Sequence, residues 1–467
     1  MCAFNRRRHR LAFGALLYAA LIAPVTVMAQ VHDPGVRHAA TDGGPPVPLP
    51  GLTADELEYF QNGLTRFQDV EVVSGGTNNG LGPRFNSNQC SSCHQQPFIG
   101  GSSPAANTQI AAAHAGGATN QIPWFIVPHG PVREARFKTS NGVADGGVHA
   151  LFTITGRTDA GSCDIAQPVF TPAGNPLTGQ GGNPNIIFRI PTPTMGAGLI
   201  EAIPDSAIRA NQQATAAARQ GTGVAGHTNS IVGGVVNTSG NDGTITRFGW
   251  KAQNKSLLMF AGEAYNVEMG ISNQLFPQER DETPGCQGSF PAPNDTNNFT
   301  ASSTTGTLSD IEAFADFMRM LAPPTPAPPT VSTQHGNKLF VSIGCALCHT
   351  PTMTTGSAIA SGSSSSPSTA LSNKQANLFS DLLVHHMGTG LADGVSQGAA
   401  GPDEFRTAPL WGVGQRMFFL HDGRTSDIVA AIRDHASQGS EANQVIQNFM
   451  ALEPGDQQDL VNFLRSL

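Results

Sequence analysis

Two pentapeptides of the form Cys-x-x-Cys-His occur in this chain, at residues 90–94 and 345–349. The pattern is the signature of c-type haem attachment. Two thiols three residues apart can reach the two vinyl groups of one haem, and the adjacent histidine can bind its iron as an axial ligand. We therefore predict two covalent c-type haems, with the attachment residues Cys90, Cys93, His94, Cys345, Cys348 and His349.

Zinc binding and thiol redox chemistry are the alternative uses of such paired cysteines. A Cys₄ zinc site is disfavoured because the two pairs lie much further apart than in a zinc ribbon, and each is followed by histidine. A redox dithiol is disfavoured because neither pair lies in a strand–helix–strand pattern. Haem attachment is therefore the preferred interpretation of both pentapeptides.

The cysteines outside the pentapeptides are Cys2, Cys163 and Cys286. Cys2 belongs to a predicted leader. Exported proteins tend to pair their remaining cysteines in an oxidising compartment, so we predict a disulfide between Cys163 and Cys286. Redox-active free thiols are the alternative, but neither cysteine lies in an electropositive or helix-start setting that would activate it.

Residues 1–29 have the organisation of a secretory signal peptide. Four arginines precede an apolar run from Leu11 to Ile22, and small residues around Ala29 fit a cleavage site. The apolar run is too short to favour the alternative, an uncleaved membrane anchor. We therefore predict a periplasmic protein with no stable membrane span.

Composition limits the partners that the chain can bind. The formal net charge is −8, and it becomes more negative once the arginine-rich leader is removed. An acidic exported protein is a poor candidate for nucleic-acid binding. Its charge could instead attract a basic protein partner. The 53 glycines and 33 prolines predict that much of the backbone is irregular.

The elements that would position the two motifs form a repeated order. A predicted helix at 53–67 precedes the first motif, and an amphipathic helix in the segment "TLSDIEAFADFMRMLAPP" (307–324) follows it. The second motif lies between another short helix and a closing helix at 454–467. An entry helix, a haem motif, loops and a closing helix are the order of a class I cytochrome c domain.

We therefore predict a mainly α-helical fold with two cytochrome-c-like domains, the first enlarged by a loop-rich insertion with short β elements. The runs "PWFIV" (123–127) and "NIIFRI" (185–190) are the strand-like segments of that insertion. The predicted organisation is a signal peptide at 1–29, an N-terminal linker at 30–50, a first haem domain at 51–321, a Pro-rich linker at 322–333 and a second haem domain at 334–467.

Each haem iron needs a second axial ligand or an open position, and methionine or histidine is the usual ligand. His435 is favoured for the second haem because it ends a predicted helix shortly before the closing helix. The other candidates after the second motif are His385, His386, Met387, Met417 and His421.

Near the first haem, the informative residues are Trp250, Glu268 and Met269, the last two in a predicted Val-Glu-Met-Gly turn. A carboxylate beside an open haem site would suit general acid–base catalysis on a peroxide. The alternatives are that Glu268 is a solvated loop residue, that Trp250 is a core residue, and that Met269 closes the haem site as a ligand.

Five long motifs carry a resemblance to a known family. The chain resembles the bacterial di-haem oxidoreductases, a family of peroxidase-like and thiol oxidoreductase-like proteins that are distant relatives of the di-haem cytochrome c peroxidases and of the methylamine-utilisation di-haem enzyme. The motifs are "GLGPRFNSNQCSSCHQQPFIGGSSP", "FGWKAQNKSLLMFAGEAYNVEMG", "IGCALCHTPT", "SDLLVHHMGTGLADG" and "EFRTAPLWGVGQRMFFLHDGRT".

The resemblance implies roles for particular residues. In the related peroxidases a C-terminal haem accepts electrons from a small cytochrome and passes them by way of a tryptophan to an N-terminal haem, where peroxide is cleaved. By motif, Trp250 matches that tryptophan, and Glu268 matches the catalytic acid of a Pro-Val-Glu-Met-Gly segment in which Asn266 replaces proline here. His435 falls at the sixth-ligand position, where the peroxidases have methionine.

Two departures from the family pattern affect the expected partners. Ligation by two histidines lowers a haem potential relative to His/Met ligation, which leaves open whether the donor is a small cytochrome c or a cupredoxin. The residues "QRMFFL" before His421 lack the Thr and Pro that line the inter-haem calcium site of the peroxidases, so calcium binding also stays open.

We predict electron transfer coupled to reduction of hydrogen peroxide, with Glu268 and Trp250 at the reaction site. Two other functions are considered. One is a non-catalytic di-haem electron carrier in which Met269 or a histidine closes the first haem site. The other is a di-haem oxidase that modifies a protein or a thiol.

Overall fold

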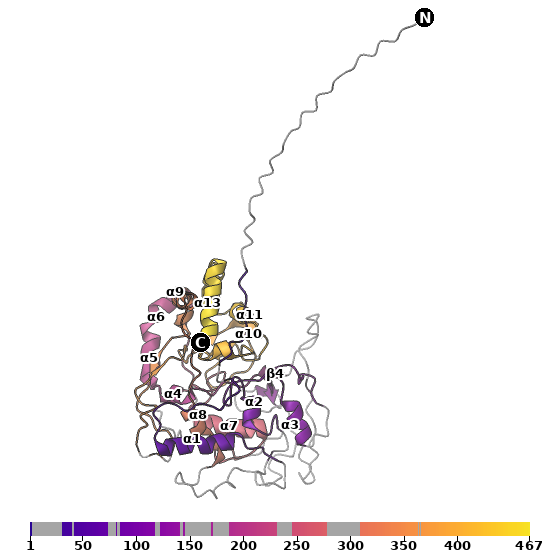
Figure 1. The fold of residues 1–467 in the computed structure, drawn as a ribbon, viewed down its shortest axis with the longest axis vertical. Helices are drawn as coiled ribbons and strands as arrows, with labels where there is room; N and C mark the ends of the chain where they lie inside the picture. The colour runs from indigo at the N-terminus through magenta and orange to yellow at the C-terminus, as the bar shows by residue number, and fades with distance from the viewer. Residues whose placement is uncertain are drawn as a thin grey trace.

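The computed structural model describes Met1 and residues 30–39, 42–72, 81, 85–116, 122–140, 143–144, 170, 186–230, 245–277, 309–362, 364 and 366–467. Helices dominate this part of the chain, and its strands are short. The mainly α-helical class is therefore as predicted. Figure 1 shows α9, α11 and α13 together in the upper part of the molecule, and α1, α2, α7 and α8 in the lower part.

One group of helices is built around α8 (Asp310–Met320), which packs along α1 (Ala54–Phe67) and also against α7 (Leu257–Met269). Both α1 and α8 begin with a capping box. At the start of α1, the side chains of Thr53 and Glu56 each accept a hydrogen bond from the other residue's backbone N–H. Ser309 and Glu312 do the same at the start of α8. The start of α1 is where the sequence predicts it, whereas the capping box of α8 was not predicted.

The second group is built around α9 (Val331–Ser342) and α13 (Pro454–Ser466). The rings of Phe340 and Phe463 lie 5.4 Å apart at this contact. Helix α9 begins at Val331, within the range that the sequence assigns to the Pro-rich linker. Asp33 also belongs to this group, because its carboxylate pairs with Arg465 on α13 and accepts a hydrogen bond from the Ile428 N–H.

Shorter elements connect these helices. The further helices are α2 (Cys90–Cys93), α3 (Gln109–Ala115), α4 (Ala197–Ala202), α5 (Asp205–Ala214), α6 (Ala216–Thr222), α10 (Gly388–Leu391), α11 (Ile428–Asp434), α12 (Asn443–Met450) and the 3₁₀ turns η2 (Cys345–Leu347) and η3 (Val413–Gln415). The strands form antiparallel pairs: β1 (Glu134–Phe137) with β4 (Ile186–Arg189), β2 (Thr139–Ser140) with β3 (Val143–Ala144), β5 (Met353–Thr354) with β6 (Gln375–Ala376), and β7 (Val384–His386) with β8 (Glu404–Arg406).

One of the two predicted strand segments is correct. "NIIFRI" contains β4, but "PWFIV" forms turns, and the partner of β4 is β1. Pro123 offers no backbone N–H to a ladder, and Phe125 and Ile126 are buried against the strand pair as packing residues. The apolar run is therefore explained by burial rather than by strand pairing.

The core of the lower helix group also includes residues from the C-terminal half. Leu378, Leu383 and Trp411 are buried in the same cluster as Phe60 and Phe317. The predicted domain boundaries stay a prediction. None of the helices in the described ranges is both long enough and apolar enough to span a membrane.

Candidate functional site: two cofactor cavities

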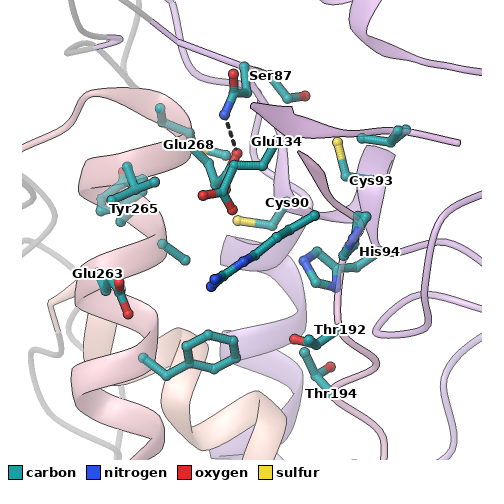
Figure 2. A pocket seen from close by; sticks show the side chains of 18 of the residues that line it. Ser87, Cys90, Cys93, His94, Glu134, Thr192, Thr194, Glu263, Tyr265 and Glu268 are labelled. Carbon is teal, nitrogen blue, oxygen red and sulfur yellow. Dashed lines mark hydrogen bonds between the residues drawn. The ribbon is translucent and has the colours of Figure 1, made fainter. Parts of the chain in front are cut away.

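The first cavity contains the residues of the first pentapeptide. Cys90, Cys93 and His94 line it, and its space, which opens to solvent, is about 1140 Å³. The one-turn helix α2 carries both thiols, so they project from neighbouring positions at the cavity wall (Figure 2). A mainly apolar pocket with a few polar groups on its wall is typical of a cofactor site.

His94 is oriented for ligation through one ring nitrogen. Its Nδ1 lies 3.1 Å from the carbonyl oxygen of Gly101, which fixes Nδ1 as the protonated nitrogen and leaves Nε2 with a lone pair. Burial lowers the pKa of His94 to about 4, so the imidazole is neutral, which is the form that binds a metal. Phe67 on α1 packs edge-on against the ring.

Glu268 lies in the last turn of helix α7 and lines the first cavity, so the expectation of a separate turn was wrong. The Asn86 side-chain amide donates to its carboxylate at 2.6 Å, and the Asn86 backbone N–H donates to its carbonyl at 2.7 Å. Burial, followed by the negative charge of Glu134, raises the pKa of Glu268 well above its ordinary value. The carboxyl group can therefore hold a proton at neutral pH.

Glu134 and Arg136 are cavity residues that the sequence reasoning missed. Figure 2 shows the carboxyl groups of Glu134 and Glu268 beside each other, and the two side chains share a hydrogen bond. Arg136 contacts the Glu134 carboxylate, and its Nη2 lies 3.6 Å from Oε1 of Glu263. Nothing in the local sequence links strand β1 to the end of α7. The alternation Glu-Ala-Arg is the only signal of a polar strand face.

The second cavity contains the residues of the second pentapeptide. Cys345, Cys348 and His349 line it, and its space, which opens to solvent, is about 1420 Å³. Nδ1 of His349 lies 3.1 Å from the carbonyl oxygen of Phe379, so this ring also presents Nε2 as its free nitrogen. Burial is the main cause that lowers the pKa of His349 to about 4, and the nearby His435 is the second cause.

His435 lines the second cavity from the C-terminal end of α11. Its Nδ1 lies 2.7 Å from the carbonyl oxygen of Ala431, one helical turn earlier, which leaves Nε2 available. Helix α11 is held at its start by Asp427, whose carboxylate accepts hydrogen bonds from the N–H groups of Val429 and Ala430. The structure thus brings His435 and His349 into one cavity.

The other ligand candidates have different surroundings. His385 lies between two carboxylates, with Nε2 3.0 Å from Asp381 and Nδ1 2.7 Å from Glu441, so neither ring nitrogen is free. His386 is half-exposed. His421 lines the second cavity, where its ring stacks on Phe405 at 4.2 Å. Met387 also lines this cavity.

Trp250 lies at the wall between the two cavities and lines both. Its indole N–H donates to the Ile190 carbonyl at 2.9 Å, and its own carbonyl accepts the Arg406 N–H at 2.9 Å. Only 9% of its surface is exposed. A core residue and an electron relay would both be buried here, so burial alone does not distinguish these two predicted roles of Trp250. Met269 lines the first cavity together with Glu268.

Three further predictions concern a disulfide, a signal peptide and a calcium site. Cys163, Cys286 and the predicted signal peptide lie outside the described residues, apart from Met1. For calcium, the one candidate metal cluster found in the described ranges is His335, Asp456 and Asp459, which lies between α9 and α13 and lines neither cofactor cavity. The four pentapeptide cysteines form no disulfide.

Each cavity therefore combines two thiols and a histidine whose Nδ1 lies within hydrogen-bond distance of a backbone carbonyl, an arrangement typical of a protein with two cofactor sites. Residues 183–467 match the family described as "Di-haem oxidoreductase, putative peroxidase". The chain belongs to this family and is an oxidoreductase, and haem is the cofactor type of that family.

The solved structures that resemble the chain are distant. Hydrazine synthase of Kuenenia stuttgartiensis shares 20% identity over 35% of this chain and 56% of its own, with a TM-score of 0.23. A MauG-like protein associated with microbial copper homeostasis shares 17% identity over 36% of this chain and 55% of its own, with a TM-score of 0.24. The chain thus spans little more than half of either protein, and such TM-scores support no conclusion. No curated protein gave a significant match.

Proposed function

We propose that this di-haem oxidoreductase is a periplasmic c-type protein that reduces hydrogen peroxide with electrons from a small donor protein, a cytochrome c or a cupredoxin. One haem would be attached at Cys90 and Cys93 with His94 as its axial ligand. The other would be attached at Cys345 and Cys348, with the axial ligands His349 and His435.

The observation that supports a reaction at the first cavity is the position of Glu268. A protonatable carboxyl group lines the same cavity as Cys90, Cys93 and His94, with Asn86 holding it in place. In the second cavity the neutral imidazole of His435 lines the wall, and the carboxylate of Glu441 is bound to His385. The two sites therefore differ in the way that a peroxide site and an electron-transfer site would differ.

When bound, haem would supply the iron that takes up peroxide and the electrons that reduce it. Reduction of hydrogen peroxide to two waters needs two electrons and two protons. The Glu268 carboxylate would accept the proton of the incoming peroxide and deliver it to the departing oxygen. Asn86 would hold Oε2 during this transfer, and Glu134 would bond the same carboxyl group.

Electrons would enter at the second cavity and pass to the first. Trp250 supports a path between the two sites, because it lines both cavities and is held by hydrogen bonds from its indole and to its carbonyl. His435 would keep the second iron six-coordinate, so that this site exchanges electrons without binding peroxide.

The test is peroxide turnover with reduced small cytochromes and cupredoxins, on protein confirmed to contain two haems. General acid–base groups contribute about 10²–10⁴-fold, so Glu268→Gln should lower kcat/KM for peroxide by roughly that factor. Glu453→Gln is the control, because Glu453 is exposed at the start of α13 and makes no capping bond there. It should turn over peroxide like the wild type.

Electron paramagnetic resonance separates the alternatives. An open first site predicts one high-spin and one low-spin haem after partial reduction. Two low-spin, six-coordinate haems with no turnover would instead identify an electron carrier, with Met269 as the ligand of the first iron. Full activity in Glu268→Gln would remove Glu268 from the reaction.

A further inference from the structure

Two buried arginines line the second cavity. Arg406 ends strand β8 and Arg416 follows the turn η3, and their residues are 9% and 7% exposed. Both also line a small neighbouring cavity whose wall includes Trp250. The guanidinium groups therefore lie on the side of the second cavity that faces the first.

Neither arginine has an acidic partner in the described part of the chain. Arg406 Nε donates to the Gly249 carbonyl at 3.1 Å, and Arg416 Nη2 donates to the Pro409 carbonyl at 3.0 Å. Arg416 Nε is buried with no hydrogen-bond partner at all. The other arginines that are buried in the described part of the chain each form an ion pair with a carboxylate, as Arg465 does with Asp33. These two cations are the exception.

Burial without a counter-ion is costly for both groups. It lowers the pKa of Arg416 to about 10, and burial together with the charge of Arg416 lowers the pKa of Arg406 to about 10. No carboxylate offsets this effect. A buried unpaired charge costs several kcal/mol, so two neighbouring ones require an anion in the assembled protein.

We propose that Arg406 and Arg416 bind the two propionate groups of the haem that would be attached at Cys345 and Cys348. Two guanidinium groups match two carboxylates in charge, and the free Nε of Arg416 supplies a donor for one of them. This inference rests on the proposed haem at this site, but it does not depend on peroxide as the oxidant.

The pairing has a consequence for the electron-entry site. Ferrous haem carries one positive charge fewer than ferric haem, so nearby cations stabilise the reduced state and raise the reduction potential. Ligation by His349 and His435 acts in the opposite direction. Arg406 and Arg416 therefore offset the low potential expected from two histidine ligands, which keeps this haem within reach of a small donor protein.

The experiment is potentiometric titration of the two-haem protein, with the low-spin haem followed separately from the other. Arg406→Gln and Arg416→Gln should each shift the midpoint of the low-spin haem to lower potential, and the double variant should shift it further. Arg416→Lys keeps the charge and should shift it less. Arg433→Gln, which removes an exposed arginine of α11, should leave it unchanged.

A second measurement needs no variant. Resonance Raman spectra of the wild type should show propionate bending bands that move on H/D exchange, because guanidinium N–H groups donate to them. The proposal fails if those bands are insensitive to exchange. It also fails if the folded double variant keeps the wild-type midpoint, or if only the first haem shifts. Peroxide turnover enters none of these outcomes, so they are independent of the proposed activity.

Discussion

Glu134 and Glu268 are two carboxyl groups that share one hydrogen bond in the first cavity, beside the guanidinium of Arg136. The nearby negative charge of Glu134, added to burial, disfavours ionisation of Glu268, so Glu268 keeps its proton to a higher pH than an ordinary glutamate. Glu134 therefore controls the pH at which Glu268 becomes a carboxylate. Glu268 and the residue that influences its ionisation come from different elements, α7 and β1.

Glu134→Gln should move the acidic limb of the pH profile for peroxide turnover to lower pH. Removal of the Glu134 charge lowers the pKa of Glu268, so the basic form needed for the first proton transfer appears at lower pH. The measurement is kcat/KM for peroxide across the acidic range. The double variant with Glu268→Gln should be no slower than Glu268→Gln alone, and an unchanged limb in Glu134→Gln would contradict the coupling.

Glu71 gives a pH prediction for stability. The Tyr265 hydroxyl lies 3.1 Å from Glu71 and 3.0 Å from Asp310, and burial followed by the Asp310 charge raises the pKa of Glu71 to about 7. The folded state therefore binds a proton that the unfolded state has lost, from a pH near the ordinary value of 4.5 up to about 7. In that window the contribution of Glu71 to the free energy of unfolding falls as pH rises.

Glu71→Gln removes this term. It should flatten the pH dependence of the unfolding midpoint between about 4.5 and 7, and it should raise the free energy of unfolding above pH 7 by up to roughly 3 kcal/mol. Thermal unfolding at a series of pH values measures both. The same slope in the variant and the wild type would show that Glu71 ionises normally in the folded protein.

At the scale of elements, each helix pair meets at a glycine. A Cβ on Gly336 of α9 would lie 2.0 Å from the Asp459 carbonyl of α13, and one on Gly63 of α1 would lie 2.2 Å from the Ala313 carbonyl of α8. Backbone atoms cannot move aside without separating the helices. The two motifs are therefore held by helix pairs that approach too closely for any side chain at the contact.

Gly336→Ala should destabilise the protein by about 1–3 kcal/mol, the usual cost of overpacking, measured as a lower unfolding midpoint. Gly221→Ala is the matched control. Gly221 lies in helix α6, and a Cβ there would meet no atom within 4 Å. Because alanine favours a helix over glycine by up to about 1 kcal/mol, this variant should be neutral or stabilised. Equal loss in both would show that the close approach is unimportant.

The elements that could be predicted from the sequence are those whose signals are local. The capping pair Thr53 and Glu56 indicates the start of α1, and helical spacing places His435 at the end of α11. Strand β1 could not be predicted, because its partner β4 is distant in the sequence. The two polar cavity residues of β1, Glu134 and Arg136, were therefore not predicted either. Arg406 and Arg416 were also missed, although they lie inside a motif that carries the family resemblance.

At the scale of the whole molecule, each cavity is assembled from distant parts of the chain. The first brings Glu268 and Glu134 to the pentapeptide at 90–94, and the second brings Arg406 and His435 to the pentapeptide at 345–349. A single sequence contains no record of such contacts, because packing alone determines them. Composition and motif spacing can indicate the cofactor, whereas only the folded chain indicates what surrounds it.

The wall between the two cavities allows a test of electron transfer across the whole molecule. Trp250 lines both cavities, and Arg406 joins it to strand β8 through a backbone hydrogen bond. Trp250→Phe keeps an aromatic ring but loses the N–H bond to Ile190, which should cost about 1 kcal/mol of stability. Phenylalanine is also harder to oxidise and reaches less far across the wall. Electron transfer between the two sites should therefore slow, while both haem spectra stay as in the wild type.

Stopped-flow absorption after mixing reduced protein with peroxide measures that transfer directly. Trp411→Phe is the matched control, because Trp411 is 5% exposed and borders the small neighbouring cavity but neither cofactor cavity. It should lose some stability and keep the wild-type rate. If electron transfer slows equally in both variants, the effect reflects loosened packing. A relay through Trp250 requires that the rate falls in Trp250→Phe and not in Trp411→Phe, because only Trp250 lines both cavities.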